Sequence, residues 1–401
     1  MMKFGYEILF VVSALINWSS AFAQNDSTRF TFDGYVKDME GFYSFEKSFP
    51  GNAGNELDNL NYNLVHKRLN FGLYPFRNFT VSMSLRNRFY WGSIVNEIPG
   101  YAEMTAKDDG LADLSWNLVK GKNNFLNTCI DRLNIDYTFG KWEVKLGRQR
   151  INWGMNLVWN PNDIFNAYSF FDFDYEERPG SDALLLTWYT SYSSSLDLAV
   201  KGGRTLKERA FAAKYRFNVK DCDIQVLSGI SGYDYVAGAG WSGNVGSWAF
   251  RGETTAFFPM SEYEDISHKA LSASLSCDYT FASSLYMQYA FLYNSSGTTG
   301  NHQDISILNP NLELSAKNLS IGKYELFAQC SYPFATLYTA GLSAMLNPND
   351  ASAYIAPSLQ ISLSNNVSLF VISQLMLGKE GSEYASMGNI CAIFGRLQWS
   401  F

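Results

Sequence analysis

Apolar and polar residues alternate with a period of two along most of this chain. From Leu271 to Phe281 every second residue is apolar, and the residues between them are Ser, Asp or Thr. In the segment 323–332 the apolar face begins and ends with an aromatic residue, Tyr324 and Tyr332. Side chains of a β-strand point alternately to its two faces, and about ten residues suffice for a tilted strand to cross the hydrocarbon of a bilayer. The alternation therefore predicts membrane-crossing strands with one apolar face, one polar face and interfacial aromatics.

About eighteen such segments occur after residue 29. They lie near 30–42, 62–75, 78–91, 127–139, 142–150, 181–190, 194–202, 207–217, 221–231, 233–242, 246–257, 268–281, 284–294, 321–332, 335–346, 351–364, 366–378 and 388–401.

The connections between these segments alternate in length. The tight ones lie at 75–78, 139–141, 218–221, 282–284, 333–335 and 364–366. The longer ones lie at 46–61, 92–126, 151–180, 258–267, 295–320 and 379–387. Short turns at one end and long loops at the other are typical of outer-membrane barrels, whose short turns are periplasmic. We therefore expect an all-β fold, a transmembrane antiparallel up-and-down β-barrel of about 18 strands (range about 16 to 18). An even count places both termini on the periplasmic side.

A soluble β-sandwich or propeller would also show alternation. Against it, the polar face consists of Ser, Thr, Asn, Gln and Arg rather than a solvated Lys/Glu face, and a sandwich does not require connections that alternate in length. The chain also ends on a strand with apolar or aromatic residues at alternate positions up to Trp399 and Phe401. This ending resembles the signal that the barrel-assembly machinery recognises, and we assign that role to Trp399 and Phe401.

The N-terminus has the features of a secretory signal peptide. A basic residue is followed by an apolar stretch too short to span a bilayer and by a small-x-small cleavage pattern at Ala21-Phe22-Ala23. We expect residues 1–23 to be the signal peptide and residues 24–401 the barrel, with 151–180 as a constriction loop.

Composition narrows the class further. After the signal peptide no run of eighteen apolar residues occurs and the mean hydropathy is −0.14, which argues against a helical membrane protein. The net charge of −7 argues against a nucleic-acid partner. All five cysteines fall on the apolar parity of their segments, so we expect them to face lipid as small hydrophobic residues. They are Cys129, Cys222, Cys277, Cys330 and Cys391.

If the apolar residues face lipid, the alternate residues line a lumen. Five basic residues on the second to fifth segments share that inner face. They are Arg68, Arg86, Arg88, Arg132 and Lys145. Charged side chains cost little when they face water. They form either an ordinary solvated face or a basic wall along one side of a pore.

The segment 151–180 fits neither a strand nor a helix, and loops of this length in compact folds are commonly functional. Its acidic residues are Asp163, Asp172, Asp174, Glu176 and Glu177. Its aromatic residues, which can anchor the loop to the wall, are Trp153, Trp159, Phe165, Phe170 and Phe171. We expect the loop to fold inward so that an acidic lip opposes the basic wall, since ion pores commonly use charged side chains for selectivity. A loop that lies outside the pore is the alternative.

Several segments resemble a group of largely uncharacterised outer-membrane barrels from Bacteroides-like Gram-negative bacteria. They read GYVKDM (34–39), HKRLNFGLYP (66–75), IDRLNIDYTFGKWEVKLGRQRINWG (130–154), WNPNDIFN (159–166) and DFDYEERPGSDA (172–183). The order Gly147-Arg148-Gln149 followed by Trp153-Gly154 is also similar to the alginate-export and related porin-like barrels. This resemblance implies a monomeric or trimeric barrel with a loop folded inward.

We therefore expect a porin-like channel for passive diffusion of small hydrophilic solutes in the outer membrane of a Gram-negative bacterium. The alternatives are an export barrel for a polysaccharide or glycan within an envelope machine, and a barrel that serves only as an anchor or adhesin. The three histidines are scattered and no G-x-S-x-G elbow accompanies them, so we expect no enzyme, no catalytic residue, no metal and no cofactor. Expected partners are outer-membrane lipid and lipopolysaccharide, the barrel-assembly machinery and the solutes, with a homo-oligomer allowed.

Overall fold

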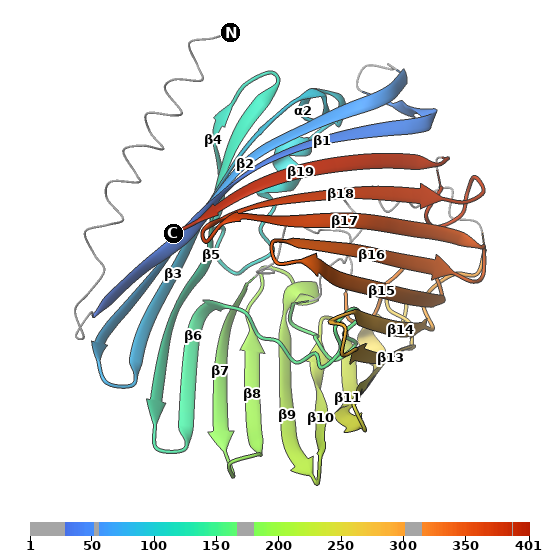
Figure 1. Cartoon of the computed structure of the whole chain (residues 1–401). Helices are drawn as coiled ribbons and strands as arrows, with labels where there is room; N and C mark the ends of the chain where they lie inside the picture. The colour runs from blue at the N-terminus through green and yellow to red at the C-terminus, as the bar shows by residue number, and fades with distance from the viewer. Residues whose placement is uncertain (1–28, 52–55, 167–179, 301–314, 387) are drawn as a thin grey trace.

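The computed structural model describes residues 29–51, 56–166, 180–300, 315–386 and 388–401. Within these ranges the chain forms an antiparallel sheet that closes on itself as a barrel (Figure 1). Eighteen strands make the wall, and each pairs with the wall strand before it and the wall strand after it. The expected all-β up-and-down barrel of about 18 strands is confirmed.

The wall strands are β1 (Phe30–Pro50), β2 (Glu56–Phe76), β3 (Phe79–Trp91), β5 (Asn124–Phe139), β6 (Trp142–Gln149), β7 (Ser181–Tyr189), β8 (Ser195–Lys201), β9 (Ala210–Val219), β10 (Cys222–Ser231), β11 (Asp234–Val245), β12 (Trp248–Pro259), β13 (Ala270–Thr280), β14 (Tyr286–Asn294), β15 (Tyr324–Ala335), β16 (Tyr338–Asn347), β17 (Ser352–Ser364), β18 (Val367–Leu377) and β19 (Ile390–Ser400).

The barrel closes between its first and last strands. Figure 1 shows the blue β1 beside the red β19, and their register places Tyr35 opposite Ser400. At the end of this seam the backbone amides of Gly34 and Phe401 each donate to the other's carbonyl oxygen at 2.9 Å. Closure pairs the two strands that would otherwise be sheet edges, and such edges are where sheets aggregate.

Connections at one end of the barrel are short, as between β2 and β3 or between β5 and β6, whereas most at the other end are longer. The expected loop at 46–61 is wrong in its extent. β1 and β2 continue into it, and beyond a bulge Phe49 still pairs with Leu57. Strand pairing is made by backbone hydrogen bonds, so β1 and β2 stay paired in this region although their side chains no longer alternate between apolar and polar.

The connection between β3 and β5 is folded rather than irregular. It contains α2 (Ser93–Glu97), α3 (Tyr101–Ala106) and the short strand β4 (Ser115–Lys120), which pairs with the first half of β5. Two 3₁₀ turns, η2 (Leu206–Glu208) and η3 (Ser261–Tyr263), lie in loops at the same end. None of the helices in the described ranges has the length and apolar character needed to cross a membrane.

The two faces of the wall separate apolar from polar residues. On β13, Leu271 and Leu275 are exposed on the outside, whereas Ser272, Ser274 and Ser276 are buried on the inside. Outward-facing residues of this kind are what a barrel presents to lipid, and inward-facing polar residues are what it presents to a lumen.

A bulge on β5 reverses this pattern for one cysteine. Ser84 pairs with Arg132 and Leu85 pairs with Ile130, so Asp131 is skipped in the register. The skipped residue moves Cys129 to the inner face, where it is buried beside the Arg86 guanidinium. The expectation that Cys129 faces lipid is therefore wrong. The other four cysteines keep the outward parity and are partly or fully exposed.

Candidate functional site

The described part of the 151–180 segment, residues 151–166, lies inside the barrel, where a carboxyl group of β12 accepts three of its backbone N–H groups. Glu253 of β12 faces inward and is only 4% exposed. Its Oε1 accepts the backbone N–H groups of Met155 and of Asn156, the latter at 2.6 Å, and its Oε2 accepts the N–H of Asn162 at 3.0 Å. Three donors on one carboxylate fix the path of the loop from β6 across the lumen to β12.

Small polar residues of the inner wall seat the same loop. The Ser276 hydroxyl donates to the Asn156 side-chain oxygen at 2.5 Å, and the Asn156 amide donates to the Ser274 hydroxyl. The Thr255 hydroxyl donates to the Asn162 side-chain oxygen at 2.7 Å. The inner faces of β12 and β13 thus satisfy the polar groups of a loop that is buried from water.

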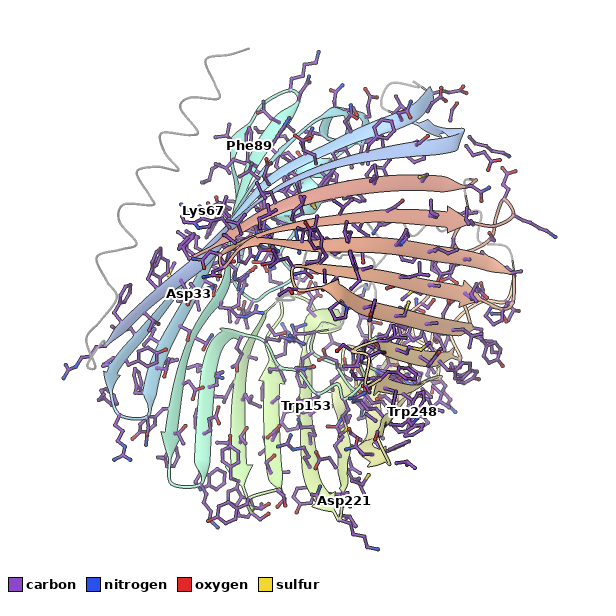
Figure 2. The ribbon with its side chains drawn as sticks, in the orientation of Figure 1. Asp33, Lys67, Phe89, Trp153, Asp221 and Trp248 are labelled. Carbon is purple, nitrogen blue, oxygen red and sulfur yellow. The ribbon has the colours of Figure 1, made fainter. Side chains whose placement is uncertain are left out.

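The three described aromatic residues of the loop are buried against the inner wall. Trp153 lies over β9 and β10 (Figure 2), where Gln225 donates to its carbonyl oxygen at 2.6 Å. The rings of Trp153 and Phe165 meet edge to face with centroids 4.8 Å apart, and Trp159 meets Phe327 of β15 at 6.3 Å. The two further anchors expected, Phe170 and Phe171, lie outside the described residues.

Three of the five basic residues gather at the β5 bulge. Arg68 Nη1 lies 2.5 Å from one carboxylate oxygen of Asp131, and Arg86 Nη2 lies 3.1 Å from the other. Arg132 donates to the Asp131 carbonyl oxygen at 2.8 Å. The bulge thus places a buried carboxylate among the arginines, so this part of the wall carries ion pairs.

The other two basic residues lie apart from that cluster. Arg88 donates to the Asn127 side-chain oxygen at 2.8 Å, nearer the loop end of the barrel. Lys145, nearer the short turns, pairs with Asp136 at 2.9 Å. The five side chains therefore occupy several heights of the wall, each beside a polar or acidic neighbour.

The acidic residues of the loop are described only in part. Asp163 is fully buried in the inward segment, where its backbone N–H donates to the Asn160 carbonyl oxygen at 3.1 Å. The other four expected lip residues lie outside the described part of the chain. They are Asp172, Asp174, Glu176 and Glu177.

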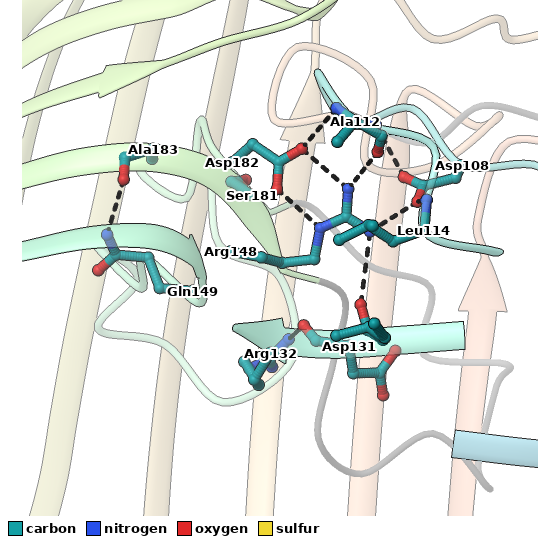
Figure 3. A network of polar contacts seen from close by, with 12 residues as sticks. Asp108, Ala112, Leu114, Asp131, Arg132, Arg148, Gln149, Ser181, Asp182 and Ala183 are labelled. Carbon is teal, nitrogen blue, oxygen red and sulfur yellow. Dashed lines mark hydrogen bonds and ion pairs between the residues drawn. The ribbon is translucent and has the colours of Figure 1, made fainter. Parts of the chain in front are cut away.

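Arg148 joins three elements at the loop end of the barrel (Figure 3). Its Nε and Nη2 donate to the two carboxylate oxygens of Asp182 on β7 at 2.7 and 2.8 Å. Its Nη1 donates to Asp108 of the β3–β5 connection at 2.6 Å, and its Nη2 also donates to the Ala112 carbonyl oxygen. A bidentate arginine is among the strongest polar contacts in proteins, so this residue fixes the β3–β5 connection against β6 and β7.

The residue before this arginine must be glycine. Gly147 has a φ of +113°, and a Cβ at this position would overlap the Leu133 carbonyl oxygen of β5. After the arginine, Gln149 donates its side-chain amide to the Ala183 carbonyl oxygen at 3.0 Å. The Gly-Arg-Gln sequence is therefore a structural joint between β5, β6, β7 and the loops above them.

A cavity of about 930 Å³ opens at the loop end, bounded by Arg86, Arg88 and Arg148 and by residues 164–166 of the inward loop. Its walls mix both signs of charge. The basic residues that line it are Arg86, Arg88, Lys107, Arg148, Lys201, Lys207 and Lys317, and the acidic ones are Asp108, Asp109, Asp131 and Asp234. No group of three or more His, Cys, Asp or Glu side chains arranged to hold a metal ion occurs in the described ranges.

Sequence reasoning missed the residues that organise this site. Glu253, Asp131, Asp108 and Asp182 were not singled out. The alternation of 248–259 places Glu253 on the inner face of its strand, so the sequence could have indicated an inward-facing acidic residue there. Asp131 carries no such signal, because its position depends on a bulge.

No protein-family model matches this chain, and no curated protein matches its sequence. Its fold is nevertheless shared with solved barrels. It is similar to OccAB4 of Acinetobacter baumannii, with a TM-score of 0.59 at 9% identity over 94% of this chain and 99% of that one. It is also similar to two barrels of Pseudomonas aeruginosa. For OccK11 (OpdR) the TM-score is 0.57 at 10% identity, over 93% of this chain and 96% of that one. For OccK5 (OpdH) the TM-score is 0.57 at 8% identity, over 93% of this chain and 98% of that one. At such identities the likeness shows a shared fold.

Proposed function

We propose that this chain is an outer-membrane porin-like channel through which small hydrophilic solutes diffuse passively. The observation that carries the proposal is a closed 18-strand barrel whose polar inner wall seats a loop across its lumen, with a cavity at the loop end. The solved barrels OccAB4, OccK11 (OpdR) and OccK5 (OpdH) share this fold, and this likeness supports an outer-membrane channel for small solutes. The alternative of an export barrel finds no support in these comparisons.

We further propose roles for the charged residues. The basic wall of Arg68, Arg86, Arg88, Arg132 and Lys145 and the acidic lip of Asp163, Asp172, Asp174, Glu176 and Glu177 would together set which charged solutes pass. The ion pairs at Asp131 and Asp136 support a wall of balanced rather than wholly positive charge.

The remaining assignments follow from the same model of function. Residues 1–23 direct export, the short turns and both termini face the periplasm, and Trp399 and Phe401 are read by the assembly machinery. The outer face contacts lipid and lipopolysaccharide. Within the porin-like barrels, we retain the proposed kinship with the Bacteroides-type and alginate-export-like group on the segments 130–154 and 159–183.

Purified protein in planar bilayers tests the proposal. We expect discrete channels from the intact chain and a larger conductance after deletion of 155–177, because the deletion removes the part of the loop held by Glu253. Swelling of liposomes in small sugars should follow the same order. If neither protein gives channels or swelling, the porin assignment is wrong.

A further inference from the structure

Two carboxyl groups lie side by side, away from water, near the loop end of the barrel. Glu325 of β15 is 0% exposed and Glu383 of the β18–β19 connection is 2% exposed. A Cβ added to Gly322 would overlap an oxygen of each carboxyl group. The two groups therefore share one small pocket, and a buried pair of like charges in such a space is strongly unfavourable.

The hydrogen bonds around the pair are asymmetric. The Ser320 hydroxyl lies 2.7 Å from Glu383 Oε1 and 3.2 Å from Glu325 Oε1, and its one proton can serve only one of them at a time. Glu383 also accepts the Ile321 N–H at 3.2 Å and the Asn347 side-chain amide at 2.8 Å. With these donors, Glu383 is the better site for a negative charge.

Glu325 has weaker support for a charge. It accepts the Tyr384 hydroxyl at 2.8 Å. Burial raises the pKa of Tyr384 well above its usual range, so the phenol keeps its proton and stays the donor. The other titratable groups that face this pocket from the surrounding elements are Asp350 of the β16–β17 turn and Tyr354 of β17. In the described part of the chain, no Lys, Arg or His forms an ion pair with Glu325 or Glu383.

We propose that Glu325 and Glu383 share one proton, and that this proton latches the β18–β19 connection and the 315–322 segment to the barrel wall. Loss of the proton as the pH rises leaves two adjacent buried charges. The latch is therefore intact at low and neutral pH and is released in alkaline solution.

The latch lies against the seat of the inward loop. Tyr384 and Leu319 belong to the same buried apolar cluster as Trp159, Phe327 and Tyr354. Release of the β18–β19 connection would remove Tyr384 from the apolar cluster that contains Trp159. The latch would thus make the channel pH-sensitive, a consequence that rests on the proposed function.

Hydrogen exchange of residues 379–386, measured by mass spectrometry on the full chain in lipid nanodiscs, tests the latch without any transport assay. After correction for intrinsic rates, we expect protection to fall with rising pH between about pH 6 and about pH 9, by up to about tenfold per pH unit, the limit for loss of one proton. E325Q should stay protected at both pH values, because its amide can donate to Glu383 as a protonated Glu325 does. E380Q is the matched control, since Glu380 lies on the same connection and pairs with Lys47 in solvent, and it should behave as the wild type.

The proposal is overturned if wild-type protection does not change with pH, or if E325Q loses protection as the wild type does. It is also overturned if calcium restores protection at about pH 9 and a chelator removes it at about pH 6, since a cation would then hold the pair. If E325Q does not fold, the pH dependence of wild-type exchange, measured with and without chelator, is sufficient to test the proposal. If the protein forms no channels but shows the pH-dependent exchange, the latch is supported and the porin assignment is wrong.

Discussion

At the scale of single residues, Glu253 determines how the inward loop is held. The Glu253 carboxyl group accepts three backbone N–H groups and leaves none of them buried without an acceptor. The position of the loop therefore depends on a side chain of β12 as well as on its own buried residues.

Glu253→Ala should loosen the loop while leaving the wall strands paired. We expect the free energy of unfolding in urea to fall by about 2 kcal/mol, because three buried backbone N–H groups lose their acceptor. Conductance in planar bilayers should rise or fluctuate. Glu262→Gln, at an exposed site on η3, is the control. Unchanged stability together with unchanged conductance would show that the loop is held in some other way.

Arg148 and Lys145 belong to the same strand but should differ in their contribution to stability. The side chains of the Arg148–Asp182 pair are 7% and 15% exposed, whereas those of the Lys145–Asp136 pair are 29% and 24% exposed. Removing one partner of a buried pair leaves an uncompensated charge, whereas pairs open to water contribute little.

We therefore expect Arg148→Ala to lower the free energy of unfolding by about 3 kcal/mol. Lys145→Ala should lower it by less than about 1 kcal/mol. Urea titrations followed by tryptophan fluorescence measure both changes in the same buffer. Equal losses for the two variants would mean that the Arg148 network is not the joint proposed for the loop end.

At the scale of elements, the last strand both closes the barrel and carries the proposed assembly signal. The backbone of Phe401 bonds to Gly34, and its ring lies 4.8 Å from Trp399 and 5.7 Å from Phe32. The backbone bonds depend on the strand, whereas recognition by another protein would depend on the ring. Substitution of the side chain separates these two roles.

Phe401→Ala should reduce the amount of folded barrel in cell membranes several-fold while its refolding in detergent stays near wild type. Heat-modifiable migration on gels measures the folded fraction in both settings. Phe76→Ala removes an exposed aromatic ring at a turn on the same end of the barrel and serves as the matched control. If the two variants accumulate equally well in membranes, the terminal ring is not a signal.

At the scale of the whole molecule, the barrel divides its tryptophans between two environments. Trp188 stacks on Trp142 at 5.4 Å on the outside near the short turns, and is 39% exposed. Trp159 is buried inside against β15. Interfacial aromatics of the first kind are typical of barrels in a membrane.

Quenching of tryptophan fluorescence by lipids brominated near the head group should distinguish these positions. Trp188→Phe should reduce the quenchable part of the signal, because its ring faces lipid. Trp159→Phe should reduce total fluorescence and leave the quenchable part unchanged. The opposite pattern would place the Trp188 side of the wall away from lipid.

The sequence alone determined the wall. All eighteen wall strands fall on segments that alternate with a period of two, because that period follows from local backbone geometry and needs no distant partner. Most tight turns were likewise predicted, as at 139–141. The turn expected at 333–335 is wrong in its position, because β15 continues to Ala335, which pairs with Tyr338. The extent of β1 and β2 was not predicted, because the end of β1 and the start of β2 pair through the backbone without an alternating side-chain pattern.

The tertiary structure decided what meets inside the wall. The bulge at Asp131 turns Cys129 inward and places a carboxylate among the arginines. A bulge adds one residue to one strand of a pair, and the composition of the segment does not show where it occurs. Glu253 and Asn156 are 97 positions apart, and the other hydrogen bonds that seat the loop also join residues far apart in the chain. Such contacts depend on the closure of the whole barrel, whereas the alternation of inward and outward side chains depends only on neighbouring residues. The sequence therefore specified a barrel and an unusual loop, and only the closed barrel brought that loop to Glu253.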